Sequence, residues 1–159
     1  MGGAPHIGSD LSELGVPLPD LQGFCHIEFT VRDADASAAW YEKVLGFSVR
    51  GEYHPPNAYL IVMEHPSGLI LGFWQHAQSP SSDLFDEFRT GLDHLAFRVS
   101  TRDEVDEWAE RFKSLGVECS EPVDIGRRGV ILTFRDPDNI QLEVHYQSPP
   151  HAPYDYVTA

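Results

Sequence analysis

GLDHLAFRV, residues 91–99, repeats the pattern of GFCHIEFTV, residues 23–31, and this pair of stretches decides the fold. Each places a histidine three residues after a glycine, His26 in the first stretch and His94 in the second. After each histidine, apolar residues alternate with other residues, which is typical of a β-strand with one buried side. A strand that occurs twice, each time with its histidine, indicates an internal duplication.

The duplication extends over most of the 159-residue chain. VLGF at 44–47 corresponds to SLGV at 114–117, and HPSGLILG at 65–72 corresponds to DPDNIQLE at 136–143, while the offset changes only from 68 to 71 residues. The sequence therefore predicts an α+β fold made of two βαβββ modules. Its expected parts are an N-terminal segment (1–22), module one (23–75), a linker (76–90), module two (91–147) and a C-terminal tail (148–159).

Each module is expected to contain a strand, a helix and three further strands. The expected strands are 24–31, 47–54, 58–64 and 69–75, then 92–99, 117–124, 129–135 and 140–146, and the expected helices are 34–45 and 102–115. Asp33 suits the N-cap of the first helix, and Thr101 with Glu104 forms a capping box for the second. Gly46 and Gly116 suit the two C-terminal ends.

The overall composition excludes some partners and compartments. The formal net charge of −14 at pH 7 would repel nucleic acid. No apolar run reaches the length of a membrane span, and residues 1–22 lack the pattern of a signal peptide. We therefore expect a cytoplasmic protein that has no membrane partner, in which Cys25 and Cys119 are buried free thiols.

The alternation of side chains along the strands separates polar from apolar residues. The apolar sides are expected to pack on the helices, and the opposite sides carry His26, His94 and Glu143. Two imidazoles and one carboxylate are a familiar ligand set for a divalent metal ion that keeps open coordination positions. The pattern therefore favours a metal site at these three residues.

Four stretches together resemble the vicinal oxygen chelate superfamily, which includes glyoxalase I, fosfomycin-resistance enzymes, extradiol dioxygenases and bleomycin-resistance proteins. They are HIEFTV, WYEKVLGF, DHLAFRV and DPDNIQLEV. The resemblance covers about residues 23–147 and implies a cupped mixed sheet with the helices on its outer face. It also implies a divalent ion (Fe, Mn, Zn, Ni or Mg) held in the cup by His26, His94 and Glu143.

The same resemblance implies a homodimer, because small members of the superfamily commonly pair their modules across two chains. In that arrangement His26 of one chain and His94 with Glu143 of the other share an ion. Pairing of the modules within one chain is the alternative.

The resemblance leaves the reaction open. Glyoxalase I-like members have a fourth, acidic ligand where this chain has Gly72, and Glu28, Glu64 or His76 could replace it. Of these, His76 is also the candidate for acid–base catalysis, since a free imidazole titrates near neutral pH.

The favoured function is that of a metal-dependent enzyme, of lyase or isomerase type, acting on a small substrate that chelates the ion through neighbouring oxygens. One alternative is an extradiol-type dioxygenase, although Thr133 stands near where that group has a tyrosine. Another is a metal-free small-molecule binding or antibiotic-resistance protein. Residues 144–150 contain no Lys or Arg, whereas fosfomycin-type enzymes have basic residues there.

Overall fold

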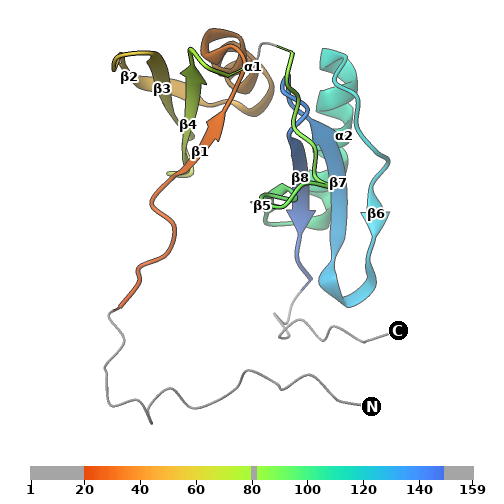
Figure 1. The fold of residues 1–159 in the computed structure, drawn as a ribbon. Helices are drawn as coiled ribbons and strands as arrows, with labels where there is room; N and C mark the ends of the chain where they lie inside the picture. The colour runs from red at the N-terminus through yellow and green to blue at the C-terminus, as the bar shows by residue number, and fades with distance from the viewer. Residues whose placement is uncertain (1–19, 80–81, 149–159) are drawn as a thin grey trace, which may run out of the picture.

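A computed structural model describes residues 20–79 and 82–148, which form an α+β fold with two four-stranded mixed sheets (Figure 1). Module one contains β1 (Ile27–Thr30), α1 (Ala34–Leu45), β2 (Ser48–Tyr53), β3 (Ala58–Glu64) and β4 (Ile70–His76). Module two contains β5 (Leu95–Val99), α2 (Arg102–Leu115), β6 (Val123–Asp124), the 3-10 turn η2 (Gly126–Arg128), β7 (Val130–Arg135) and β8 (Gln141–Tyr146).

The two sheets have the same topology. Their strand orders are β1-β4-β3-β2 and β5-β8-β7-β6, so β1 and β5 are equivalent edge strands. In each sheet the edge strand runs parallel to its neighbour, and the other described pairs are antiparallel. The predicted pair of βαβββ modules is therefore confirmed.

The ends of both helices follow from their own sequences. Asp33 accepts a hydrogen bond from the backbone N–H of Ala36 at 2.9 Å, and the capping box of Thr101 is complete. Gly46 and Gly116 end the helices at φ values of 80° and 70°, in the left-handed region that glycine adopts easily. The helix bounds match the prediction because capping is a local interaction.

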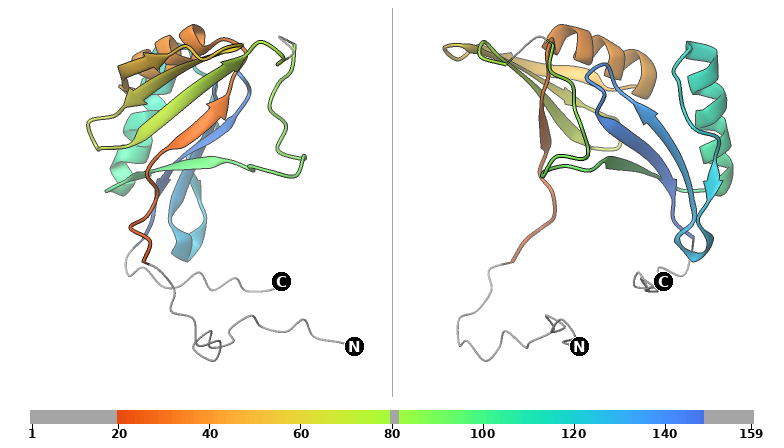
Figure 2. Two further views of the ribbon diagram at one scale, coloured as in Figure 1. Left: turned by 60° about the vertical axis from the view of Figure 1, so that its left-hand side comes forward. Right: turned by 45° about the vertical axis from the view of Figure 1, so that its right-hand side comes forward.

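The helices lie on the apolar faces of the sheets and join them into one hydrophobic core (Figure 2). The ring of Trp40 in α1 stacks on Phe134 in β7, with centroids 6.3 Å apart, and Phe134 also contacts Phe112 in α2. Arg111 of α2 donates hydrogen bonds to the backbone carbonyls of Lys43 and Val44 at the end of α1. The polar faces of the sheets are therefore the ones left for a site.

Three expected strands are shorter than predicted by three residues or more. The strands expected at 24–31 and 92–99 begin at Ile27 and Leu95, so His26 and His94 stand one residue before them. The strand expected at 117–124 is reduced to β6 and a bridge from Cys119 to Phe134. A strand needs a continuous hydrogen-bonded neighbour, and this edge segment contains Pro122, which has no backbone N–H to donate.

Two further expectations concern surface segments. The thiols of Cys25 and Cys119 are free, as predicted, but both residues are exposed rather than buried, because neither lies inside a sheet.

The α-helices of the described residues are α1, with 12 residues, and α2, with 14 residues. Neither is long and apolar enough to cross a bilayer. The C-terminal tail, apart from residue 148, lies outside the described residues.

The linker between the modules is bound to the turn that joins β7 to β8. The backbone N–H of Phe85 donates to the carbonyl of Asp138, and the side chain of Asn139 donates to the carbonyl of Phe85, both at 2.9 Å. Arg135 forms an ion pair with Glu87 at 2.6 Å. The described part of the linker is therefore held against module two without forming a helix.

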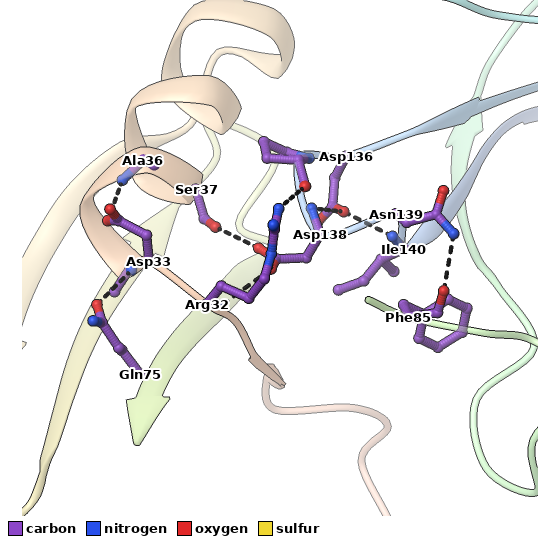
Figure 3. A network of polar contacts seen from close by, with 12 residues as sticks. Arg32, Asp33, Ala36, Ser37, Gln75, Phe85, Asp136, Asp138, Asn139 and Ile140 are labelled. Atoms are coloured by element: carbon purple, nitrogen blue, oxygen red, sulfur yellow. Dashed lines mark hydrogen bonds and ion pairs between the residues drawn. The ribbon is translucent and has the colours of Figure 1, made fainter. Parts of the chain in front are cut away.

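The same turn connects the two modules through buried carboxylates (Figure 3). Asp138 accepts hydrogen bonds from the backbone and side chain of Arg32, at 3.0 and 2.8 Å, and from the hydroxyl of Ser37 at 3.2 Å. Asp136 accepts from the hydroxyl of Tyr41 at 3.2 Å and from two backbone N–H groups of its own turn. We call these residues, Arg32, Ser37, Tyr41, Asp136 and Asp138, the intermodule network.

The intermodule network makes stability depend on pH. Burial, and secondarily the charge of Asp138, raises the pKa of Asp136 from 3.8 to about 6. The folded protein therefore binds this proton more tightly than the unfolded chain, so this group's stabilisation is lost as pH rises from about 4 through about 6.

We expect Asp136→Asn to flatten this part of the pH dependence, because the amide oxygen keeps both backbone hydrogen bonds and the amide does not ionise. Denaturant unfolding of wild type and variant between pH 4 and pH 7 measures the difference. Parallel curves for the two proteins would contradict the assignment to Asp136.

Candidate metal centre

Module two holds one carboxylate and one imidazole on the polar face of β8. Glu143 is only 7% exposed, beside Ala96 of β5 and Thr133 of β7. His145 lies two residues further along the same face, with Nδ1 3.1 Å from Oε1 of Glu143 and Nε2 3.0 Å from the carbonyl oxygen of Arg128. Because a carbonyl oxygen only accepts, Nε2 carries a hydrogen, and Nδ1 pairs with the carboxylate of Glu143 when the ring is protonated.

The sequence analysis assigned no role to His145. The signal that could have found it is its spacing of two residues from Glu143, which puts both side chains on one face of a strand. What the spacing alone does not give is the carbonyl of Arg128, which comes from the turn η2 and fixes the second ring nitrogen.

His94 stands immediately before β5. Its Nδ1 is 2.6 Å from Oδ1 of Asp93, and because a carboxylate accepts, Nδ1 carries the hydrogen. The lone pair of the ring is then on Nε2, where it is available to a metal ion. An imidazole that donates one N–H to a carboxylate and binds metal through the other nitrogen is the common arrangement in metalloproteins.

Module one holds the third predicted ligand. The side chain of His26 is 51% exposed, and its Nε2 lies 3.8 Å from Oε1 of Glu28. The other oxygen of Glu28 accepts a hydrogen bond from the indole N–H of Trp74 at 2.7 Å. Glu28 and Trp74 thus occupy the polar face of β1 and β4, next to His26.

The other candidates for the fourth ligand position lie along the same sheet. The ring of His76, at the end of β4, stacks on Trp74 with centroids 5.5 Å apart and planes within 4° of parallel. Glu64 forms an ion pair with Arg50 at 3.1 Å. His76 therefore supports the indole that binds Glu28, whereas the charge of Glu64 is already compensated.

A single chain does not assemble the predicted ligand set. Residues 20–79 and 82–148 contain no group of three or more His, Cys, Asp or Glu side chains that could hold a metal ion. His26, His94 and Glu143 are all described, so each module presents its part of the set separately. The set itself stays a prediction.

A cleft of about 380 Å³ lies where the edges of β1 and β5 approach each other. His26 and Phe24 line it from module one, and Leu95 and Ala96 from module two. Phe24 is 95% exposed, so the single chain leaves apolar surface uncovered beside His26.

The chemistry of these donors fits a divalent cation. His94 presents the lone pair of Nε2, Glu143 is a buried carboxylate, and His26 is an accessible imidazole. Nitrogen and carboxylate ligands of this kind suit Zn, Fe, Ni and Mn. The two module-two ligands also have outer partners, Asp93 and His145, which would hold them in position.

Comparison with known proteins gives consistent results. Residues 23–144 match the family model of the Glyoxalase/Bleomycin resistance protein/Dioxygenase superfamily. A fosfomycin resistance protein, FosX, of Listeria monocytogenes is 29% identical over 126 residues, which are 79% of this chain and 90% of that protein. The family match includes both histidine-bearing stretches.

Solved structures have the same fold. A glyoxylase/bleomycin resistance protein/dioxygenase domain from Frankia sp. EAN1pec is 34% identical with a TM-score of 0.76, over 83% of this chain and 96% of that one. A FosX variant of Listeria monocytogenes, in complex with Mn(II) and 1S,2S-dihydroxypropylphosphonic acid, is 23% identical with a TM-score of 0.62, over 82% and 94%. The second likeness concerns the fold.

Proposed function

The chain belongs to the glyoxalase/bleomycin resistance protein/dioxygenase superfamily, and from this membership we propose that it is a metal-dependent enzyme with a small-molecule substrate. The observation that carries the proposal is the pair formed by His94 and Asp93, because it directs the lone pair of Nε2 to a cation. The ligands are His26, His94 and Glu143. Mn(II) in the complex of the related FosX variant supports a divalent ion.

The complete site forms between two chains. His26 comes from one chain, and His94 with Glu143 comes from the other. Two features support this arrangement: the separation of the ligands within the single chain, and the exposed apolar residues just before β1. Leu21 and Phe24, which are 91% and 95% exposed, would be covered by a second copy.

The bound ion would act as a Lewis acid on a substrate that chelates it through two neighbouring oxygens. The ligand of the FosX variant, a 1,2-dihydroxy compound, has its hydroxyl groups on adjacent carbons. In this chain, Asp93 accepts a hydrogen bond from Nδ1 of His94, and His145 lies beside the carboxylate of Glu143.

The reaction is of the lyase or isomerase type, in which proton transfer accompanies the stabilisation of charge on a substrate oxygen. Ring-cleaving dioxygenation is less favoured, since Thr133, beside Glu143 in the sheet, takes the place near which that group has a tyrosine. A metal-free binding protein would have no use for the outer partners of His94 and Glu143.

Fosfomycin resistance is a second candidate. The 29% identity with FosX over 79% of this chain favours it. Against it, residues 144–150 contain no Lys or Arg to hold a phosphonate group. Conversion of fosfomycin by Mn(II)-loaded protein, followed by ³¹P NMR, distinguishes this candidate from enzymes that use other chelating substrates.

The proposal predicts that purified protein binds a divalent metal ion through His94. We expect His94→Ala to weaken Mn(II) binding by at least about 10-fold. Removing even an outer partner of a metal ligand typically lowers the metal affinity by roughly 10–100-fold, and His94 is a proposed ligand itself. Competition with a chromogenic chelator measures the affinity. His54→Ala is the matched control, because His54 is 67% exposed and paired with Glu52 away from the proposed ligands. Wild-type protein that binds no divalent ion would overturn the proposal.

A further inference from the structure

The two modules carry a carboxylate at the equivalent register position of their sheets, but on different strands. In module two, Glu143 of β8 lies beside Ala96 of β5. In module one, the equivalent pair is Gly72 of β4 beside Glu28 of β1. Each module therefore has one carboxylate and one small residue at this register position. The carboxylate lies on the edge strand in module one and on the neighbouring strand in module two.

The side chain of Glu28 lies across Gly72. A Cβ atom added at Gly72 would be 2.9 Å from Cγ of Glu28 and 3.2 Å from its Oε1. The first distance is shorter than real Cβ contacts allow, so Glu28 already fills the space into which a side chain at position 72 would project. The carboxylate of Glu28 thus lies where a glutamate on β4 would begin.

The orientation of Glu28 is fixed from one side only. The indole N–H of Trp74 donates to Oε2 at 2.7 Å, and Trp74 is a neutral donor, so the negative charge is not compensated there. Oε1 is directed to His26, at 3.8 Å from Nε2. The side chain of Glu28 is 36% exposed, which leaves it accessible to a ligand on the polar face.

We propose that Glu28 supplies the carboxylate of module one to the metal site. This inference rests on the proposed function, and it gives each module one imidazole and one carboxylate: His26 with Glu28, and His94 with Glu143. Two carboxylates balance the charge of a divalent ion. A six-coordinate ion with these four ligands keeps two positions, the number that a substrate with two neighbouring oxygens requires.

The first test measures Mn(II) affinity in Glu28→Gln, using the full-length protein and a chromogenic chelator as competitor. The amide oxygen still accepts from Trp74, so the local fold is retained while the charge is lost. We expect a loss of at least about 10-fold. Glu64→Gln is the matched control on the same sheet and should bind Mn(II) like wild type, since Arg50 already compensates Glu64.

The second test moves the carboxylate from β1 to β4. Glu28→Ala should weaken Mn(II) binding, and adding Gly72→Glu to the same chain should restore it, because the pair then reproduces the arrangement of Ala96 and Glu143. Removing the Glu28 side chain also removes the close contact with a Cβ at position 72. Thermal unfolding followed by circular dichroism confirms that each variant is folded.

The outcomes separate this inference from the function on which it rests. Wild-type protein that binds no Mn(II) overturns both. Binding that is abolished in His94→Ala but unchanged in Glu28→Gln overturns only the role of Glu28. Weaker binding in Glu28→Ala that is not restored by Gly72→Glu, in a folded double variant, also overturns it, because position 72 would then not share the site.

Discussion

A heterodimer of His26→Ala and His94→Ala chains should bind Mn(II) at about half the wild-type stoichiometry, although neither variant alone retains tight binding. The reason is the proposed division of the ligands between two chains. One of the two sites in the heterodimer loses both histidines, while the other receives an intact His26 from one chain and an intact His94 from its partner. Co-expression with two different affinity tags, followed by purification on both, isolates the heterodimer.

The reverse pairing is the control. A wild-type chain combined with a chain that carries both substitutions should bind no Mn(II) tightly, because each shared site then lacks one histidine. If the modules instead paired within a chain, the results would be exchanged: the wild-type chain would keep its own site, and the first heterodimer would have none. The two heterodimers therefore decide between the arrangements.

Loss of Asp138 should have the largest effect on stability among the polar residues of the intermodule network. Asp138 is 5% exposed and accepts three hydrogen bonds, two of them from Arg32. Asp138→Ala leaves the guanidinium without this partner, and we expect the free energy of unfolding to fall by about 2–3 kcal/mol. This is at the lower end for a broken buried pair, because the side chain of Arg32 is 35% exposed. Denaturant unfolding measures the change.

Asp106→Ala provides the comparison, since Asp106 pairs with Arg102 at 2.7 Å on the exposed surface of α2. An exposed surface pair of this kind contributes little, so we expect a much smaller change in the free energy of unfolding than for Asp138→Ala. The substitution Arg32→Ala, alone and combined with Asp138→Ala, then gives the coupling energy. Independent effects of the two substitutions would contradict a direct link between the modules through this pair.

The features that the sequence predicted correctly are those that depend on neighbours in the chain. The helices, their caps and the glycines at their ends follow from a few adjacent residues, and the repeat reveals the two modules. The acids of DPDN show the limit of this reasoning. Their spacing predicts a turn, but Asp138 binds Arg32 across 106 positions of sequence, and only the packed modules bring them together.

The candidate site divides in the same way. The residue types and the alternation along strands predicted His26, His94 and Glu143 as a ligand set. The direction of Glu28 depends on the register that places it beside Gly72, and on an indole from β4. β1 and β5 begin at Ile27 and Leu95, later than predicted. Their first residues depend on where the neighbouring strands begin, since β4 and β8 start at Ile70 and Gln141.

The close contact between Glu28 and position 72 also has an evolutionary consequence. A Cβ at position 72 would meet Cγ of Glu28 at 2.9 Å, so the two positions do not accept large side chains together. Their substitutions are therefore epistatic: a glutamate at 72 is acceptable only after residue 28 becomes small, and a small residue at 28 removes a carboxylate unless 72 provides one. A glutamate at 72 combined with a small residue at 28 would therefore keep one carboxylate in module one, on β4 instead of β1.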